Sequence, residues 1–331
     1  MIKEILLIII GFLLLIIGAD ILVKGSSNIA KKFHIPEVII GLTIVCIGTS
    51  MPELLITVNS AIKNDTDLII GNAIGSNLCN LLLILGIASI LKPVKVDEEI
   101  KKFHLPVAIF ATFIVWLFSN LDIGSGHFTI GRVEGIILLT LFVIYFSFPI
   151  FTAIKDIIKE EKKIKEPRKN ISIITAVILI IIGIIMLKYG SDFVVDNCKY
   201  IATKIGISER IIGLTIVAIG TALPELITTI VATIKKDASI AIGNLVGSCM
   251  LNLWLILGIG SIITPLEVSI EFNFNLILLL FSTTLVLIFS HYIGKNNVIT
   301  KIEGTILILV FIVYIISLIK TSPFWWSFFS H

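Results

Sequence analysis

Two glutamates are the residues of this sequence best suited to hold cations. Glu53 follows Pro52 in the run GTSMPELL, Glu225 follows Pro224 in GTALPELI, and both runs lie inside long apolar stretches. A carboxylate at membrane depth costs several kcal/mol unless its charge is compensated. Neither run contains Lys or Arg, so bound cations are the natural compensation. The alternative is a pair of protonated carboxyls that only donate hydrogen bonds in packing.

The two prolines predict backbone oxygens that can face an ion. A proline inside a helix removes one amide donor, and its ring displaces the carbonyl four residues earlier. Irregular backbone at membrane depth is tolerated only where it is buried in protein or lines a wet cavity. A single proline could equally make a simple kink, but here there are two copies beside two glutamates. The carbonyls expected to be exposed lie near Gly48, Thr49, Gly220 and Thr221.

Hydroxyl and amide side chains recur at helical spacing near the glutamates. Thr49 and Ser50 precede Glu53 by four and three residues, so they share a helix face with it. Two other apolar stretches contribute the pairs Ser76 with Asn80 and Ser248 with Asn252. Each such residue alone could be an interhelical hydrogen-bonding group. As a set of oxygen ligands without His, they suit hard cations such as Ca²⁺ and Na⁺.

The composition places these residues in a bilayer. Of the 331 residues, 56% are hydrophobic and 15% charged, with a mean hydropathy of +1.07. A membrane-spanning helix needs about 20 mostly apolar residues. The sequence therefore predicts an all-α membrane protein with ten transmembrane helices. We expect them near residues 5–23, 38–62, 68–91, 104–119, 130–153, 172–195, 209–234, 240–263, 273–290 and 303–320.

The sequence contains an internal repeat. A shift of 172 residues brings GLTIVCIGTSMPELL onto GLTIVAIGTALPELI and GNAIGSNLCN onto GNLVGSCMLN, and about 31 of the 53 positions from Ile39 to Leu91 are identical. Five helices per copy predict two inverted five-helix repeats, with a site at the midplane where they meet. The expected units are residues 1–154, a basic linker at 155–169, and residues 170–331. The repeated GNxxGS runs also predict close helix contacts at Gly71, Gly75, Gly243 and Gly247.

Basic residues predict the orientation. Most Lys and Arg residues fall in alternate loops, including the linker, so these loops are expected to be cytoplasmic. We therefore expect a multi-pass protein of the cell membrane with both termini outside.

Cys46, Cys79, Cys198 and Cys249 show no metal-site or disulfide spacing.

The repeated motifs GTSMPELL, GNAIGSNLCN, GTALPELI and GNLVGSCMLN resemble the alpha-repeats of the sodium/calcium exchanger family, in its compact prokaryotic and archaeal form. The resemblance implies a Ca²⁺ site at Glu53 and Glu225 with the carbonyls of Thr49 and Thr221. It implies Na⁺ sites that use the same glutamates. Their further ligands would be Ser50, Ser76, Ser248 and the carbonyls of Cys46 and Ala218.

Other positions of the motifs qualify this resemblance. Asn80 belongs to the central group, and Asn252 stands where some members carry an acidic residue. Ala222 occupies the position equivalent to Ser50, where the family usually has a hydroxyl, and Cys249 replaces the usual asparagine. One Na⁺ site is therefore expected to be weaker.

The expected function is secondary active exchange of Ca²⁺ for Na⁺, with no cofactor, nucleic acid or obligatory protein partner. Coupling to H⁺ or K⁺ is the main alternative, since protons could replace Na⁺ on the glutamates. A passive channel would need a continuous pore instead of a repeated, alternately open site. Intramembrane enzymes need catalytic Asp pairs, Ser/His pairs or HExxH, and the apolar stretches contain none of these.

Overall fold

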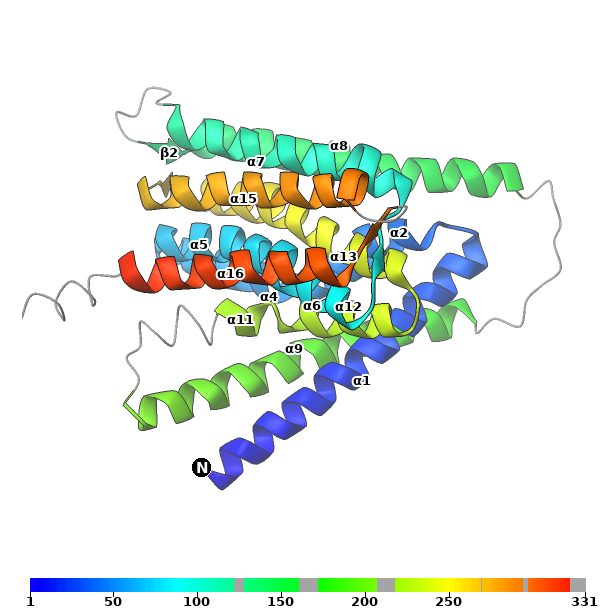
Figure 1. Ribbon diagram of the computed structural model, residues 1–331, viewed down its shortest axis with the longest axis horizontal. Coiled ribbons are helices and arrows are strands. Elements are labelled where there is room, and N and C mark those ends of the chain that lie inside the picture. Colours follow the sequence, from blue (N-terminus) through cyan, green and yellow to red (C-terminus); the bar gives the residue numbers. More distant parts are fainter. Residues whose placement is uncertain (122–127, 161–171, 207–217, 269, 294–296, 322–331) are drawn as a thin grey trace, which may run out of the picture.

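The part of the chain described by the computed structural model is almost entirely helical (Figure 1). It comprises residues 1–121, 128–160, 172–206, 218–268, 270–293 and 297–321. Within these ranges, eight helices are long and apolar enough to cross a membrane, and one bent pair of helices would make a ninth span. The protein is therefore a multi-pass membrane protein. The predicted span at 209–234 is described only from residue 218 onward.

The elements of the first half, where η marks a π-helical segment, are α1 (Ile2–Phe33), α2 (Glu37–Ile40), η1 (Gly41–Val45), α3 (Cys46–Thr49), α4 (Met51–Ile62), α5 (Thr66–Leu78), η2 (Cys79–Ile84), α6 (Leu85–Leu91), β1 (Val94–Lys95), η3 (Ile100–His104), α7 (Leu105–Asn120), β2 (Thr129–Ile130) and α8 (Arg132–Glu160). The second half contains α9 (Ile173–Lys204), α11 (Ala218–Thr221), α12 (Leu223–Ile234), α13 (Ala238–Met250), η5 (Leu251–Ile256), α14 (Leu257–Ile263), β3 (Leu266–Glu267), α15 (Ile270–Ile288), η6 (Phe289–Ile293), β4 (Val298–Ile299) and α16 (Lys301–Thr321).

The elements around the repeated motifs occur twice with the same lengths. The four consecutive elements α4, α5, η2 and α6 have counterparts α12, α13, η5 and α14, and every boundary is displaced by the same 172 residues as the sequence motifs. The π-helical segments are part of this correspondence, since η2 and η5 each span six residues. Each π-helical turn accommodates one extra residue and interrupts the regular helix, and such segments often mark functional sites.

The second predicted span is broken beside its proline. The stretches Glu37–Thr49 and Met51–Ile62 meet at an angle of 47°. Ser50 lies between them with φ −87° and ψ 11°, outside the helical range, and Pro52 stands in the first turn of α4. Ala222 takes a similar conformation, φ −82° and ψ 1°, between α11 and α12. The predicted disruption at each proline is therefore present in both halves.

Short strands and glycine contacts join the two halves. Strand β1 pairs antiparallel with β4, and β2 pairs antiparallel with β3, so each two-stranded ribbon takes one strand from each half. Helix α6 packs on α16, and α8 packs on α14. Gly86 and Gly304 meet so closely that a Cβ on either would lie 2.8–2.9 Å from the other's carbonyl oxygen. The halves are thus interlocked.

Helices α1 and α9 pack closely on each other and run obliquely to the other long helices (Figure 1). Their contact is built on glycines. A Cβ added at Gly11 would lie 2.8 Å from the carbonyl oxygen of Gly190, and one at Gly183 would lie 2.8 Å from that of Gly18. Large side chains of α1, including Leu15 and Leu22, are fully buried beside this contact.

Two of the four glycines predicted to allow close helix contact do so. A Cβ on Gly243 would lie 2.5 Å from the Val38 carbonyl oxygen, and one on Gly247 would lie 2.9 Å from that of Leu42. Gly71 and Gly75 show no comparable approach within the described residues. The repeat counterparts of Gly41 and Leu42, at positions 213 and 214, lie outside those residues.

Candidate ion-binding site

The two glutamates lie at equivalent places in the first turns of α4 and α12, directly after the helix breaks. The side chains of Glu53 and Glu225 are each only 1% exposed. They are close enough to interact electrostatically. Two buried carboxyl groups that repel each other are compensated by a bound cation or by protonation.

The polar side chains predicted to accompany the glutamates are also buried. Asn80 and Asn252 are the second residues of η2 and η5, so each lies on a π-helical turn. The buried set, all less than 7% exposed, consists of Thr49, Ser50, Ser76, Asn80, Thr221, Ser248 and Asn252. Such a concentration of oxygen atoms in the interior of a membrane protein marks an ion pathway or binding site.

Hydrogen bonds connect the two halves at this site. The Ser50 hydroxyl lies 2.8 Å from Oε1 of Glu225 and 2.9 Å from Oγ of Ser248. The Thr49 hydroxyl donates to Oδ1 of Asn244 at 3.0 Å. The break before α4 therefore brings residues of the first half directly against α12 and α13.

The two glutamates have different partners. Glu225 accepts from Ser50, but Ala222 occupies the position equivalent to Ser50 and has no hydroxyl to offer. Within the described residues, no side-chain hydroxyl donates to the carboxylate of Glu53. The backbone carbonyl of Glu53 instead accepts from Asn72 Nδ2 at 3.2 Å. The sequence departure at Ala222 thus corresponds to a real asymmetry of the site.

Four buried acceptor oxygens at the site have no donor among the described residues. They are Oε2 of Glu53, Oδ1 of Asn80, Oε2 of Glu225 and Oδ1 of Asn252, and they form two repeat-equivalent pairs. Buried polar atoms are nearly always hydrogen-bonded, so unpartnered ones indicate something that binds there. Oxygens that can only accept are satisfied by a cation or by a hydrogen-bond donor, and two of these four belong to carboxyl groups, which favour a cation. The described residues contain no cluster of three or more His, Cys, Asp or Glu for a metal, so an ion site here depends on amide, hydroxyl and carbonyl oxygens as well.

The backbone carbonyls expected to be exposed by the two prolines differ in whether they accept hydrogen bonds. No backbone amide of the described residues donates to the Thr49 carbonyl across the helix break. The Gly220 carbonyl, by contrast, accepts from the Ser191 hydroxyl at 2.8 Å. The Cys46 carbonyl already accepts from the Ser50 amide at 2.9 Å and the Thr49 hydroxyl at 3.3 Å. Ala218 opens α11, and its side chain lies outside the described part of the structure.

Three asparagines contribute to the site although the sequence reasoning did not select them. Asn77 Oδ1 accepts from Asn252 Nδ2 at 2.9 Å, and Asn77 Nδ2 donates to the Cys249 carbonyl at 3.0 Å. Asn72 and Asn244 bond to Thr57 and Thr229 in the two halves, each at 3.5 Å. Asn72 and Asn244 occupy the same position of the repeated GNxxGS motifs, and this recurrence could have identified them. Asn77 has Cys249 as its counterpart, so the repeat gave no such signal for it.

Comparison with known proteins agrees with this geometry. The family described as "Sodium/calcium exchanger protein" matches residues 3–151 and 175–320. The inner membrane protein YrbG of Escherichia coli is 35% identical over 269 residues, covering 80% of this chain and 81% of that protein. The sodium/calcium exchanger MaX1 of Methanosarcina acetivorans is 28% identical and covers 95% of this chain and 97% of that protein.

A solved structure of the sodium-calcium exchanger NCX_Mj superposes with a TM-score of 0.81 at 30% sequence identity. The superposition covers 96% of this chain and 99% of that one. The repeated glutamate motifs, the helix breaks and the fold therefore lead to one conclusion: the chain belongs to the sodium/calcium exchanger family.

Proposed function

We propose that the protein exchanges Ca²⁺ for Na⁺ across the membrane at the site formed by Glu53, Glu225 and their neighbours. The observation that carries this proposal is the set of four buried oxygens without donors, two from these glutamates and two from Asn80 and Asn252. An anionic substrate would be repelled by the two carboxylates, and a neutral one would leave their charges uncompensated. A hard cation satisfies all of them at once.

The charge of the site favours competition between the two ions. Glu53 and Glu225 together carry two negative charges when ionised, which balance one Ca²⁺ or two Na⁺. Asn252 is neutral, so it adds an oxygen without adding charge. Ions that share the same carboxylates cannot all be bound together, and this mutual exclusion is the physical basis of exchange. The relatives MaX1 and NCX_Mj, which are named sodium/calcium exchangers, support Na⁺ as the counter-ion.

The individual ligand roles that we propose are those implied by the resemblance to the sodium/calcium exchanger family. We assign Ca²⁺ to the glutamates with the carbonyls of Thr49 and Thr221. We assign Na⁺ to the glutamates together with Ser50, Ser76, Ser248 and the carbonyls of Cys46 and Ala218, with Asn80 and Asn252 at the centre. The missing hydroxyl at Ala222 weakens the Na⁺ position beside Glu53 relative to the one beside Glu225.

The proposed architecture is ten transmembrane helices in two inverted repeats, residues 1–154 and 170–331, joined by a basic linker at 155–169. The common 172-residue displacement of equivalent elements supports it. An inverted pair gives two related conformations that open to opposite sides, which is alternating access. The lysine-rich loops favour a cytoplasmic linker and termini outside the cell membrane.

The test is ⁴⁵Ca²⁺ uptake into liposomes that contain the purified protein and are loaded with Na⁺, with K⁺, or with neither at fixed pH. Uptake is expected only with an outward Na⁺ gradient, and Glu53→Gln and Glu225→Gln are expected to abolish it. The matched control is Glu134→Gln with Glu303→Gln. This second pair of buried glutamates accepts backbone amides of Gly131 and Thr300 and takes no part in the site.

The control variant should retain Na⁺-driven uptake. Uptake that ignores Na⁺ and follows a proton or K⁺ gradient would instead establish the coupling alternative. Flux that needs no counter-ion at all would contradict the exchanger proposal.

A further inference from the structure

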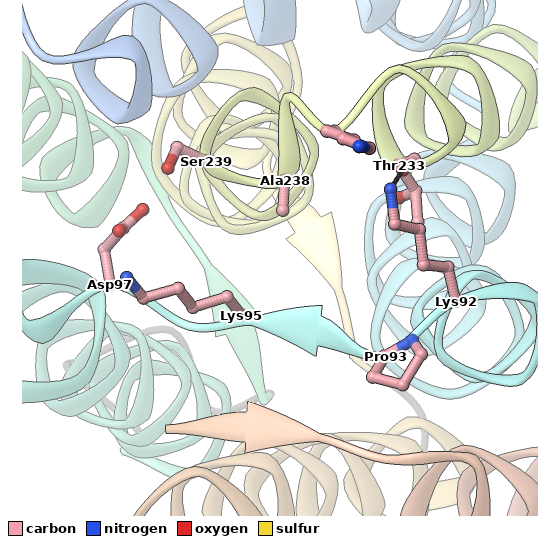
Figure 2. A pocket seen from close by; sticks show the side chains of 8 residues that line it. Lys92, Pro93, Lys95, Asp97, Thr233, Ala238 and Ser239 are labelled. Carbon is pink, nitrogen blue, oxygen red and sulfur yellow. Dashed lines mark hydrogen bonds between the residues drawn. The ribbon is translucent and has the colours of Figure 1, made fainter. Parts of the chain in front are cut away.

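A cavity of about 320 Å³ lies where α6, β1 and the turn between α12 and α13 meet (Figure 2). None of the residues that line it belongs to the candidate ion site. Its lining includes three lysines, Lys92, Lys95 and Lys236, and one acidic residue, Asp97. The cavity therefore carries net positive charge, which suits an anion.

The three lysines have charge available for a ligand. Within the described ranges, none of them pairs with a carboxylate, although Lys31, Lys101, Lys102, Lys188 and Lys235 do. Lys92 donates to the Thr233 carbonyl at 3.2 Å, which holds its ammonium at the cavity and leaves its other N–H groups for a ligand. Lys95 and Lys236 are exposed.

The first turn of α13 adds to the positive potential. Ala238 and Ser239, its first two residues, line the cavity. The first amides of a helix have no partner within the helix and favour anions. At the equivalent helix α5, the side chain of Asp65 accepts one such amide, from Leu68, at 3.2 Å. The side chain of Asp237 makes no such bond at α13, and the equivalent amide, that of Ile240, donates instead to the Asp237 backbone carbonyl at 3.0 Å. The amides of this turn that keep no backbone acceptor among the described residues are therefore those of Ala238 and Ser239, the two residues that line the cavity.

The carboxylate of Asp97 indicates that the ligand also carries a hydrogen-bond donor. Its Oδ2 atom is buried and has no donor among the described residues. A phosphodiester group brings only acceptors to Asp97, whereas a headgroup hydroxyl brings a donor. The cavity thus combines cations for a phosphate with an acceptor for a neighbouring hydroxyl.

The surroundings of the cavity favour a lipid over a soluble phosphate ester. Leu91 directly precedes Lys92 and is 54% exposed, and Ile234 precedes the turn that carries Lys236 and is 61% exposed. These side chains end the apolar helices α6 and α12, so lysines and apolar surface adjoin at the level where headgroups lie. Basic pockets between membrane helices are suited to anionic headgroups.

We propose that this cavity binds the headgroup of an anionic phospholipid. The phosphodiester lies among Lys92, Lys95 and Lys236, and a headgroup hydroxyl donates to Asp97 Oδ2. Because Lys92 comes from the end of α6 and contacts the end of α12, the bound lipid ties the two halves together beside the helix that carries Glu225.

The experiment measures thermal unfolding of the purified protein in a neutral detergent during titration with short-chain phosphatidylglycerol. Phosphatidylmethanol, which has the same charge but no hydroxyl, and phosphatidylcholine are the comparison lipids. Glycerol 3-phosphate is the soluble arm. We expect phosphatidylglycerol to raise the unfolding temperature most. The combined substitution Lys92→Gln, Lys95→Gln and Lys236→Gln should weaken its apparent affinity by at least about tenfold.

A charge-matched control carries Lys24→Gln, Lys32→Gln and Lys301→Gln, three exposed lysines that do not line the cavity. This control should bind phosphatidylglycerol as the unmodified protein does. Asp97→Asn, which replaces one acceptor oxygen by a donor amide, should reduce the preference for phosphatidylglycerol over phosphatidylmethanol.

Equal weakening in the control variant would overturn the proposal, because binding would then reflect overall charge. An equal effect of glycerol 3-phosphate at the same concentration would overturn the assignment to a lipid. These measurements detect binding without transport, so they are independent of the proposed exchange.

Discussion

The Ser50 hydroxyl lies 2.8 Å from the carboxylate of Glu225, although the two residues are 175 positions apart and belong to different halves. Ser50 is placed there by the break between α3 and α4. The corresponding contact to Glu53 does not form, because Ala222 has no hydroxyl. The site is therefore symmetric in its carboxylates and asymmetric in the hydroxyls around them.

Removing the Ser50 hydroxyl should weaken Na⁺ binding. Ser50→Ala deletes one hydrogen bond to Glu225, and such a bond contributes about 1 kcal/mol, so we expect the Na⁺ concentration for half-maximal exchange to rise about fivefold. The reciprocal variant Ala222→Ser should lower it, because it offers Glu53 a hydroxyl. Na⁺ titrations of ⁴⁵Ca²⁺ uptake provide the measurement. If Ser50→Ala and Ala222→Ser changed the half-maximal Na⁺ concentration equally and in the same direction, the assignment of these hydroxyl positions to Na⁺ binding would be wrong.

Asn77 should act by orienting Asn252. Its Oδ1 accepts from Asn252 Nδ2 at 2.9 Å, which keeps Asn252 Oδ1 in its unpartnered position. Asn77→Leu removes this constraint, and we expect apparent Ca²⁺ affinity to fall about threefold to tenfold. Thr112→Val is the control, since that buried hydroxyl only donates to the Ala108 carbonyl of its own helix. An unchanged Ca²⁺ affinity in Asn77→Leu would show that Asn252 is held by other contacts.

The contact between α1 and α9 should tolerate no added side chain. A Cβ on Gly183 would lie 2.8 Å from the Gly18 carbonyl oxygen and 2.9 Å from Leu22 atoms, including a backbone nitrogen. Overpacking of this kind costs about 1–3 kcal/mol, so Gly183→Ala should lower the unfolding temperature by several degrees. Ile182→Ala, on the exposed side of the same helix, should change it less. If Gly183→Ala raised the unfolding temperature instead, α1 and α9 would have to be able to move apart and admit the added methyl group at little cost.

Glu98, in the helical segment that leads into η3, should make the stability of the protein depend on pH in the acid range. Hydrogen bonds from Lys101, Lys102 and Asn297 lower the pKa of Glu98 to about 2 from its ordinary value of 4.5. The folded state therefore favours the ionised carboxylate. This stabilisation is complete above about pH 4.5 and is lost as the pH falls toward 2.

Unfolding temperatures of the protein and of Glu98→Gln should accordingly differ at neutral pH and converge between pH 4.5 and 2. Glu267→Gln is a suitable control, because Glu267 forms no ion pair within the described residues. A constant difference across this pH range would show that Glu98 is not stabilised by its charge.

The sequence predicted the elements of the site that depend on residue type and local spacing. Glu53 and Glu225 could be found because carboxylates are rare in apolar stretches, and the 172-residue repeat showed that they are a pair. The helix breaks followed from Pro52 and Pro224, since proline acts on the carbonyl four residues earlier in any helix.

Other features depend on contacts that no local pattern encodes. The accepting oxygen of Asn77 faces Asn252 only because α5 and η5 pack together, and the Gly220 carbonyl is occupied only because Ser191 of α9 reaches it. Ala19, at the position equivalent to Ser191, offers no such hydroxyl in the first half. The π-helical turns at Asn80 and Asn252 were likewise not predicted, since their residues are ordinary helix formers in sequence.

The pairing of strands between the two halves affects how the chain folds during synthesis. Because β1 pairs with β4 and β2 with β3, the first half leaves the ribosome with two strand edges that have no partner yet. The close contact of Gly86 with Gly304 likewise cannot form until α16, near the end of the described chain, has been made. The two halves are therefore not separate folding units, and the protein completes its tertiary structure only after the strands and helices of its second half have been made.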